Sequence, residues 1–591
     1  YKWGEATSLS LIYNYNEFLK RKLDEFVGII SKAQDTDGYL YTFNQYHFPN
    51  KRWENLLIEH ELYCMGHWLE FAIAYFKLTK NKEVLDLAKK TADIVYNKFI
   101  DSSPIEIPGH PEIEIALIKL YRITKVKKYL ELAKHFIEKR GQSRFFFFHL
   151  LKQNFAHSRK EKEVKKQKLA YYKNKDYTPP PNLFEGLAIK GPKGLKLRAY
   201  YSFLSGKYFQ AHKPIKKTSR PVGHSVRWGY LATAATMLSQ ENQDNVLLKT
   251  LEKAWDNMVK KRMYITGGIG SLPLIEGFGR DYELHPKYAY CETCAAISSI
   301  YWSWELFNAT RKAQYTDLME WQLYNAMLVG IALDGTKYFY HNPLEAENME
   351  RKSWYLTACC PSNIARTIAK ISNYIYLARK EDLWVNQYIS NKAEISPKKE
   401  VFISSSLPFG NKVLIHANSK FILHLRIPSW AKRVKISVND EEHELTNSIR
   451  EQLPFDPYKS YYWTVPKKQA NLKIELEFNI DPTIRFPHPN DKYKQGKVAL
   501  SRGPMVYCFE NIDNKMNLRE IELNLEEPIK TKKIAELDNI TALVAKHVNG
   551  EEIIAIPYYA WANRKKAEHS RNATVSYTHL RAHETRHDLV C

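Results

Sequence analysis

The stretch Gly66-His67-Trp68-Leu69-Glu70 begins a helical pattern that runs to Leu78-Thr79, and a second helical pattern follows it directly. The same design recurs from Gly109-His110 and from Gly223-His224, and once more, without the Gly-His pair, from Glu292. Helical hairpins that recur at roughly fifty residues indicate either an open solenoid or a closed ring of hairpins. The repeat therefore predicts an all-helical first region.

The Gly-His pairs give this repeat a functional interpretation. In a closed ring, the inner helices present their first turns at one mouth, and His67, His110 and His224 each stand at such a start. Three imidazoles at equivalent points would then line one pocket. The alternative is that each histidine only caps or packs its own helix, and the sequence leaves both interpretations open.

Beyond about Ala378 the hydrophobic period changes from helical to alternating, which is typical of strands. Segments with this alternation are Trp384 to Tyr388, Phe421 to Ile427, Leu472 to Phe478 and Val498 to Leu500. We therefore expect an α+β multidomain chain: a helical domain over 1–378, and β-sandwich material over 379–564. Residues 143–217 lack a clear period and are expected to form an irregular insertion. Residues 565–591 break abruptly with what precedes them and are expected to be an atypical, non-native tail.

Composition and charge limit the classes of partner. The chain has 591 residues, 44% of them hydrophobic, and a formal charge of +23, which indicates a globular protein of more than one domain. The charge fits a lysine-rich solvated surface or attraction to an acidic partner. We find no nucleic-acid-binding motif and no apolar run of roughly 18 residues that would span a membrane. The chain opens at Tyr1 without an initiator Met, so the compartment stays open.

Two short segments hold four of the seven cysteines: Tyr290-Cys291-Glu292-Thr293-Cys294 and Thr357-Ala358-Cys359-Cys360-Pro361-Ser362-Asn363. Thiolates with a nearby carboxylate are ligands that zinc selects. We predict that the segments meet around one zinc ion, held by Glu292, Cys294, Cys359 and Cys360. A four-thiolate site that uses Cys291 instead of Glu292 is equally compatible with the spacing, and unrelated buried cysteines are the third possibility.

A metal with four protein ligands has no open position for an activated water. A metal-bound thiolate can itself attack, since the metal keeps it deprotonated at neutral pH. Such a nucleophile needs a general acid for the leaving group. Glu276 follows the glycine-rich turn Thr266 to Gly270, so a place on a pocket-lining loop is one interpretation. A surface carboxylate is the other.

The chain resembles glycoside hydrolase family 127, the β-L-arabinofuranosidases, and the related family 146, from Tyr1 to about Arg564. The motifs that carry the resemblance are Gly66-His67, Pro108 to Glu114, Val222 to Arg227, Tyr264 to Gly270, Glu292 to Ala295, Cys359 to Asn363, Arg502-Gly503-Pro504 and Ile556 to Arg564. The resemblance implies an (α/α)6 catalytic barrel followed by β-sandwich domains. It also implies a retaining mechanism, which departs from the usual pair of carboxylates.

Residue by residue, the resemblance implies that Cys359 is the nucleophile and Glu276 the general acid/base. Glu292, Cys294, Cys359 and Cys360 are the implied ligands of Zn²⁺. The side chains expected to hold the sugar hydroxyls are His67, His110, His224, Glu320 and Tyr340, and His60 lies close to His67 in the sequence. Cys291 departs from the family, which usually has a small residue there, and residues 143–217 match it poorly.

These observations predict a retaining exo-glycosidase that releases terminal β-L-arabinofuranose from plant-type glycans or glycoproteins through a thioglycosyl intermediate. The expected partner is an oligosaccharide or a glycoprotein glycan, with no nucleic acid and no membrane, and a homodimer stays open. One alternative is a glycosidase of the same fold that acts on an acidic or branched pectic sugar. A second alternative is a sugar-binding protein with a structural zinc and no turnover.

Overall fold

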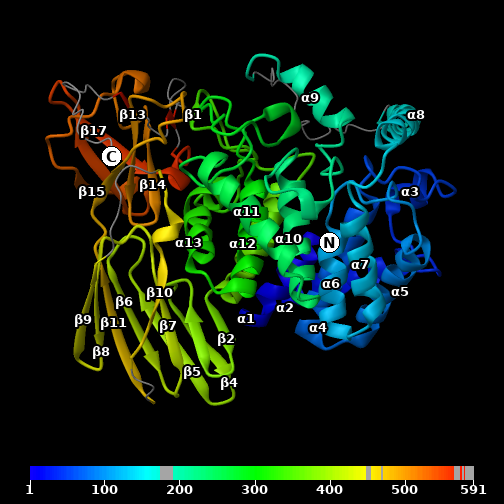
Figure 1. Cartoon of the computed structure of the whole chain (residues 1–591), viewed down its shortest axis with the longest axis horizontal. Coiled ribbons are helices and arrows are strands. Elements are labelled where there is room, and N and C mark those ends of the chain that lie inside the picture. The colour runs from blue at the N-terminus through cyan, green and yellow to red at the C-terminus, as the bar shows by residue number, and fades with distance from the viewer. Residues whose placement is uncertain (173–190, 447–453, 467–469, 565–572, 575–577, 580–591) are drawn as a thin grey trace.

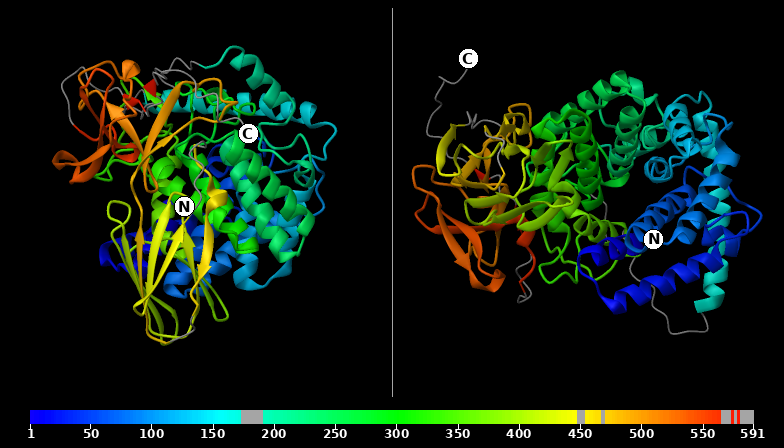
Figure 2. Two further views of the ribbon diagram at one scale, coloured as in Figure 1. Left: turned by 60° about the vertical axis from the view of Figure 1, so that its left-hand side comes forward. Right: turned by 90° about the horizontal axis from the view of Figure 1, so that it is seen from below.

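The computed structural model of the chain describes residues 1–172, 191–446, 454–466, 470–564, 573–574 and 578–579. It is a mixed multidomain structure with a helical N-terminal region and C-terminal sheet domains (Figure 1). Seen from three sides, the sheets lie along one flank of the helices (Figure 2). Within the described ranges, no helix combines the length and apolarity needed to cross a bilayer.

The helical region contains fourteen α-helices among the described residues. They are α1 (Lys2–Tyr13), α2 (Glu17–Ala33), α3 (Thr42–His47), α4 (Glu61–Thr79), α5 (Lys82–Phe99), α6 (Ile113–Thr124), α7 (Lys127–Lys139), α8 (Phe146–Tyr172), α9 (Leu195–Leu204), α10 (Ser225–Glu241), α11 (Asn245–Lys261), α12 (Thr293–Thr310), α13 (Ala313–Gln322) and α14 (Cys359–Ala369).

Six of these helices pack in a cycle. α1 packs on α4, α4 on α6, α6 on α10, α10 on α12, α12 on α14, and α14 returns to α1. A second set, α2, α5, α7, α11 and α13, packs on the outside of the first five of them in chain order. The repeat read from the sequence therefore corresponds to alternating inner and outer helices.

Hydrophobic patterning explains which helix lies in which layer. α10 buries every residue from Ser225 to Ser239, and a helix that is buried on all sides must be covered by a further layer. α5 instead buries a single stripe that includes Ala88, Ala92, Val95 and Phe99 and leaves its charged face in water. Burial of such a stripe contributes most of the stability of a surface helix.

The sheet domains contain the strands β1 (Glu345–Ala346), β2 (Tyr376–Arg379), β3 (Asp382–Val385), β4 (Asn391–Ser396), β5 (Lys399–Ser405), β6 (Lys412–Ala417), β7 (Ile422–Ile427), β8 (Arg433–Val438), β9 (Glu441–Thr446), β10 (Tyr461–Thr464), β11 (Leu472–Phe478), β12 (Pro482–Arg485), β13 (Lys497–Arg502), β14 (Met505–Glu510), β15 (Lys530–Ile534), β16 (Ile540–Lys546), β17 (Glu552–Pro557), β18 (Ala573–Thr574) and β19 (Thr578–His579). One sheet has the order β10-β7-β3-β2 and a second the order β4-β5-β6-β11-β8-β9, and both contribute to one hydrophobic core. In a third sheet, built on β1-β18-β14-β17-β16-β15, β13 pairs with β14 and β12 with β13.

The third sheet is continuous with the helical core. Val506, Cys508 and Trp561 belong to the same hydrophobic cluster as the inner helices. The ring of Trp561 stacks on that of Phe339 with 4.7 Å between centroids. Because Phe339 precedes Tyr340, the C-terminal sheet supports the backbone that carries one of the predicted site residues.

The region 143–217, expected to be irregular, contains α8 and α9 in its described part, and 173–190 lie outside the described residues. The buried positions of α8 are Phe146, Leu150, Gln153, Lys160 and Val164, which follow helical spacing. Gln153 accepts a hydrogen bond from the Leu57 N–H at 2.8 Å, and Lys160 bonds the Glu59 carboxylate at 3.1 Å. Hydrophobic periodicity missed this helix because polar residues form part of its buried stripe.

Only four residues of the expected tail 565–591 are described, and these form β18 and β19. β18 pairs with β1 and β14, and β19 pairs with β13. These short pairings join part of the tail to the third sheet. The sequence did not predict this contact, because the tail has no apolar face.

Candidate active site

The first turns of α12 and α14 bring the two cysteine segments together. Glu292 stands directly before α12, and Cys294 lies in its first turn, while Cys359 and Cys360 are the first residues of α14. Their ligand atoms all lie within 4.8 Å of one another. Cys359 Sγ and Cys360 Sγ are each 3.7 Å from Glu292 Oε1, and Cys294 Sγ is 3.1 Å from Cys360 Sγ.

These four side chains fit a tetrahedral metal site. With Zn–S bonds of about 2.3 Å, two sulfur ligands of a tetrahedron lie roughly 3.8 Å apart, and the Cys359 and Cys360 sulfurs are 3.9 Å apart. The Cys294 and Cys360 sulfurs, 3.1 Å apart, would have to separate to reach this distance. Glu292 is 2% exposed, and its Oε2 atom has no hydrogen-bond partner. A buried carboxylate oxygen without a donor is destabilised unless a cation lies beside it, so the geometry and the donor set fit zinc.

Cys291 does not join this cluster. Its backbone has a positive φ of 42°, and its N–H bonds Gly270 O at 3.0 Å. Its sulfur packs against Gly268, where an added Cβ would lie 2.7 Å from it. The four-thiolate alternative is therefore wrong in its ligand set, because the left-handed turn at Cys291 sends its side chain elsewhere.

The cluster concentrates negative charge on Cys359. Hydrogen bonds from the Cys294 and Cys360 thiols, together with the positive charge of Lys2 and the Tyr340 hydroxyl, lower the pKa of Cys359 well below its ordinary 9.0. Tyr340 Oη lies 3.0 Å from Cys359 Sγ. Burial raises the pKa of both Cys294 and Cys360. Cys359 is also the one partly exposed member of the three, so it is the thiolate that a ligand can reach.

Glu276 lies on the loop beside this cluster. It follows a short 3-10 turn, Pro273–Ile275, and has a positive φ of 47°. Tyr290 Oη donates to its Oε1 at 2.6 Å, and its Oε2 lies 2.9 Å from His224 Nε2. Its carboxylate belongs to a group with His224 and Glu292 whose atoms lie within 4.8 Å of one another, so this partly exposed acid lies beside the sulfur cluster.

The backbone fixes the orientation of this pair. The Val226 N–H donates to His224 Nδ1 at 3.2 Å, so Nδ1 is an acceptor and Nε2 carries the proton that is donated to Glu276. The next residue, Gly277, has no room for a side chain, since an added Cβ would lie 2.2 Å from Gly223 O. This close approach holds the Glu276 loop against the start of α10.

Imidazoles and a tyrosine form another part of the site. The ring of His110 lies 4.5 Å from Tyr63 and 6.2 Å from His60. His60 is exposed and lies within electrostatic reach of Cys359 and His224. Arg227 donates to Gly109 O at 2.8 Å and thereby fixes the segment that carries His110.

The structure places His67 in a different environment from the other histidines. It is 2% exposed, its Nδ1 is 3.2 Å from Glu112 Oε1, and its ring contacts Tyr63, which in turn contacts His110. His60, one residue before α4, therefore takes the place beside His110 that the sequence analysis assigned to His67. His67 lies seven residues, or about two helical turns, beyond exposed His60, and at that depth along α4 the imidazole is buried.

Glu320 is also separated from the cluster by its contacts. On α13, it bonds Arg426 Nη2 at 2.6 Å and Trp430 Nε1 at 2.7 Å, both from the sheet region. Both carboxylate oxygens are thus used in a buried contact between the helical region and β7. No contact recorded among the described residues links Glu320 to the sulfur cluster.

The sequence analysis named His60 as a close neighbour of His67, but it did not single out Tyr63, Lys2 or the Tyr290 side chain. Lys2 Nζ donates to Tyr63 Oη at 2.5 Å and is 9% exposed. The sequence signal that could have identified Tyr290 is its place at the start of the first cysteine segment, directly before Cys291. For Lys2 and Tyr63 the sequence holds no signal, because their contact joins α1 to α4 across 61 residues.

Comparisons with known proteins identify the family of the chain. The sequence profile described as "Beta-L-arabinofuranosidase, GH127 catalytic domain" matches residues 1–373, and the GH127 middle and C-terminal domains match 382–480 and 482–570. A non-reducing end β-L-arabinofuranosidase of Bifidobacterium longum subsp. longum is 31% identical over 96% of this chain and 87% of its own.

Solved structures give the same result. A GH127 β-L-arabinofuranosidase from Geobacillus stearothermophilus T6 superimposes with a TM-score of 0.80 at 31% identity, covering 98% of this chain and 89% of its own. A second GH127 β-arabinofuranosidase has a TM-score of 0.77 at 30% identity, with 98% and 87% covered. The chain belongs to glycoside hydrolase family 127 and is a glycosidase of that family.

Proposed function

We propose that this protein is a retaining exo-glycosidase that removes terminal β-L-arabinofuranose from plant-type glycans or glycoproteins. The observation that carries the proposal is the partly exposed Cys359 sulfur, which lies 3.0 Å from Tyr340 Oη in the cluster with Glu292, beside Glu276. The curated relative and the solved neighbours act on the β-L-arabinofuranosyl group according to their names, which supports this sugar.

Glu292, Cys294, Cys359 and Cys360 would hold a zinc ion. Bound there, zinc would keep the Cys359 sulfur deprotonated at neutral pH. Metal-bound thiolates suit this role because three sulfurs and a carboxylate form a soft, strongly donating set. The unpartnered Glu292 Oε2 supports a cation at this position.

The reaction uses two displacements. The Cys359 sulfur attacks the anomeric carbon while Glu276 gives a proton to the departing glycosidic oxygen, which leaves a thioglycoside on Cys359. Glu276, now a carboxylate, takes a proton from water as the water attacks the same carbon and frees Cys359. Each displacement inverts the carbon, so the released sugar keeps its configuration.

The other polar groups of the pocket suit a furanose. His110 and His224 were expected to hold hydroxyl groups, and we add exposed His60 to this set in place of His67. The Tyr290 hydroxyl and His224 both donate to Glu276. These bonds hold its carboxylate in one orientation, as general acid/base catalysis requires.

We also propose that the helical region is an (α/α)6 barrel and that the sheet region consists of β-sandwich domains. The closed cycle of six packed helices, with outer helices on five of them, supports the barrel. The common core of the first two sheets supports the sandwich.

The test is hydrolysis of an aryl β-L-arabinofuranoside followed by NMR of the first sugar released. The β anomer is expected to appear before mutarotation, and the intact mass of a Glu276→Gln variant should show one pentosyl group on Cys359. A panel of aryl glycosides with acidic sugars serves as the control for substrate. Appearance of the α anomer first would exclude a retaining mechanism, and binding without turnover would exclude an enzyme.

A further inference from the structure

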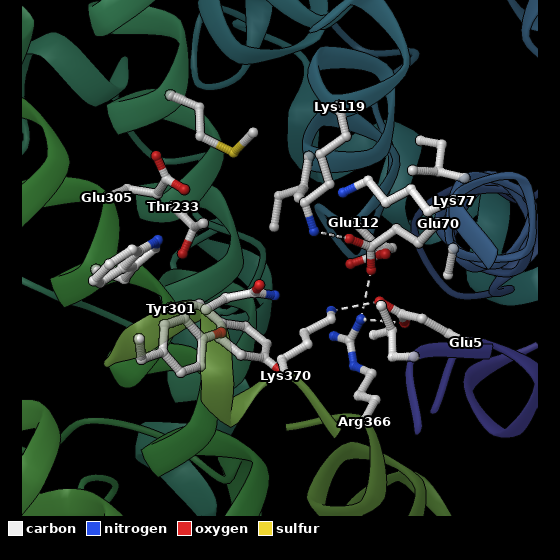
Figure 3. A pocket seen from close by; sticks show the side chains of 18 residues that line it. Glu5, Glu70, Lys77, Glu112, Lys119, Thr233, Tyr301, Glu305, Arg366 and Lys370 are labelled. Atoms are coloured by element: carbon white, nitrogen blue, oxygen red, sulfur yellow. Dashed lines mark hydrogen bonds and ion pairs between the residues drawn. The ribbon is translucent and has the colours of Figure 1, made fainter. Parts of the chain in front are cut away.

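A cavity lies among the same six packed helices, at the end opposite to the sulfur site. Its volume is about 180 Å³, and its lining comes from α1, α4, α6, α10, α12 and α14 (Figure 3). The sulfur site uses the beginnings of α12 and α14, whereas this cavity uses later residues such as Glu70 of α4, Glu305 of α12 and Arg366 of α14. The two sites thus share helices but lie at different levels along them.

Charged side chains form a paired network in this cavity. Arg366 Nη1 bonds Glu5 at 3.0 Å and also bonds Glu70, while Lys370 pairs with Glu5 and Lys119 with Glu70 (Figure 3). Glu5, Glu70 and Arg366 are each 3% exposed or less. A buried guanidinium held by two carboxylates has little freedom to turn.

This network excludes one interpretation of the same residues. Glu5, His67 and Glu70 place ligand atoms within 4.8 Å of one another and would pass for a metal site. Arg366, Lys119 and Lys370 already supply the positive charge to these carboxylates. A second divalent cation beside them would be repelled.

The guanidinium of Arg366 reaches from the cavity towards the sulfur site. Its Nη2 donates to Tyr230 Oη at 2.8 Å, and its Nε donates to Asn363 Oδ1 at 2.9 Å. Asn363 Nδ2 in turn lies 3.1 Å from Cys294 Sγ. Asn363 and Arg366 are both 1% exposed and lie three residues apart on α14.

We propose that Arg366 is a positioning residue of the sulfur site, which acts by fixing the Asn363 amide so that its N–H donates to Cys294. An arginine side chain only donates hydrogen bonds, so the Asn363 oxygen must face Arg366 and the amide nitrogen must face the sulfur. The paired carboxylates Glu5 and Glu70 hold Arg366 in this position. The inference rests on the zinc site of the proposed function.

The hydrogen bond has a defined effect on the sulfur. An N–H donor withdraws charge from a thiolate, which reduces its repulsion with the neighbouring thiolates and the Glu292 carboxylate. Residues that orient a metal ligand typically change metal affinity about 10–100-fold when they are replaced. Asn363 therefore favours Cys294 as a bound ligand, while partly exposed Cys359 is left to react.

The experiment compares full-length wild-type protein with Asn363→Leu, Arg366→Lys and, as a matched control, Lys77→Met, which changes a cation that lines the same cavity. Zinc affinity is measured by competition with a chromophoric chelator. The rate of iodoacetamide labelling at Cys294 in zinc-free protein is measured by peptide mass spectrometry. Circular dichroism checks the fold of each variant.

Asn363→Leu is expected to weaken zinc binding about 10–100-fold and to change the Cys294 labelling rate. Arg366→Lys keeps the positive charge but loses the Nε donor, so it should weaken zinc in the same direction, while Lys77→Met leaves both readouts unchanged. Wild-type zinc affinity in Asn363→Leu would overturn the inference, whether or not Arg366→Lys folds. Absence of zinc binding by the wild type would instead refute the proposed function.

Discussion

The two ends of the helical region are built from the same helices but hold opposite kinds of chemistry. At one end lie three sulfurs, imidazoles and the carboxylate of Glu276, and of these Cys359, His60 and Glu276 are at least partly exposed. At the other end, Glu5 and Glu70 are buried and paired with Arg366, Lys119 and Lys370. Fully paired charges fix the positions of the helices that carry them. Groups with unused hydrogen-bonding or ligating capacity are free to bind a ligand or to react with it.

The largest expected difference between the ends concerns turnover. Cys359→Ser is expected to lower kcat/KM for an aryl arabinofuranoside by roughly 10⁴-fold or more, because the nucleophile is lost. The thermal midpoint should change little, since Cys359 is partly exposed. Steady-state kinetics and calorimetry measure the two quantities. Full activity in this variant would show that another group attacks the sugar.

At the ionic end the expected effect is on stability. Arg366→Met leaves Glu5 and Glu70 with one fewer cation in a buried site and should lower the free energy of unfolding by about 3–5 kcal/mol. Arg122→Met removes the half-exposed pair with Glu241, 2.7 Å apart, and should cost less than about 1 kcal/mol. Urea unfolding measures both. If both variants lose the same free energy of unfolding, burial of the network does not increase its contribution to stability.

Glu276→Gln tests the acid at the sulfur end. The variant is expected to lower kcat by about 10²–10³-fold for an alkyl arabinofuranoside, because the leaving oxygen is no longer protonated. With a nitrophenyl leaving group, which needs no proton, the first displacement should be affected much less. Burst kinetics on the two substrates separate these cases. A loss that does not depend on the leaving group would remove Glu276 from the role of acid.

The smallest expected effect is a pH dependence at His67. Burial lowers the pKa of His67 well below its ordinary 6.5, so below that pH the unfolded chain binds a proton that the folded protein does not. Folding stability should therefore fall with pH below 6.5, by about 1.4 kcal/mol at one unit below. Denaturant unfolding between pH 5 and 8 measures it, and His67→Gln should flatten this slope.

Glu112 supplies the control with the opposite sign. Burial and neighbouring Glu70 raise its pKa well above its ordinary 4.5, so the folded protein keeps a proton that the unfolded chain loses as the pH rises. The free energy of unfolding therefore decreases as the pH rises above the ordinary pKa of 4.5. Glu112→Gln should remove this decrease and make the protein more stable towards neutral pH. If the free energy of unfolding of His67→Gln still decreases at acidic pH, the remaining pH dependence is assigned to Glu5 and Glu70, whose carboxylates are paired.

Much of the site could be read from local sequence. The pairs Glu292-x-Cys294 and Cys359-Cys360 were expected to converge because of their residue types and the family resemblance, and both lie at helix starts. For Glu276, the glycines around it left a pocket-lining loop and an outer surface both open, and the resemblance implied the role of general acid/base. The structure places it in hydrogen-bonding contact with His224 and Tyr290.

Other features could not be read, because they depend on contacts between distant segments. Sequence spacing alone could not choose between His60 and His67. The choice depends on depth along α4, because His67 lies about two turns beyond His60 and is buried beside Glu112. Glu320 is hydrogen-bonded to Arg426 and Trp430, which lie 106 and 110 residues away in the sequence. A local sequence pattern cannot predict a partner from another domain.

The sequence by itself indicated recurring helical hairpins and a change to strands near Ala378, and it narrowed the candidate zinc ligands to two cysteine-containing segments. Hydrophobic period and residue type decide these features locally. Only the tertiary structure decided that Cys291 turns away, that α8 is helical and that Arg366 orients Asn363 beside Cys294. Each of these depends on polar partners that are remote in sequence, and hydrogen-bond geometry becomes definite only once the helices have packed.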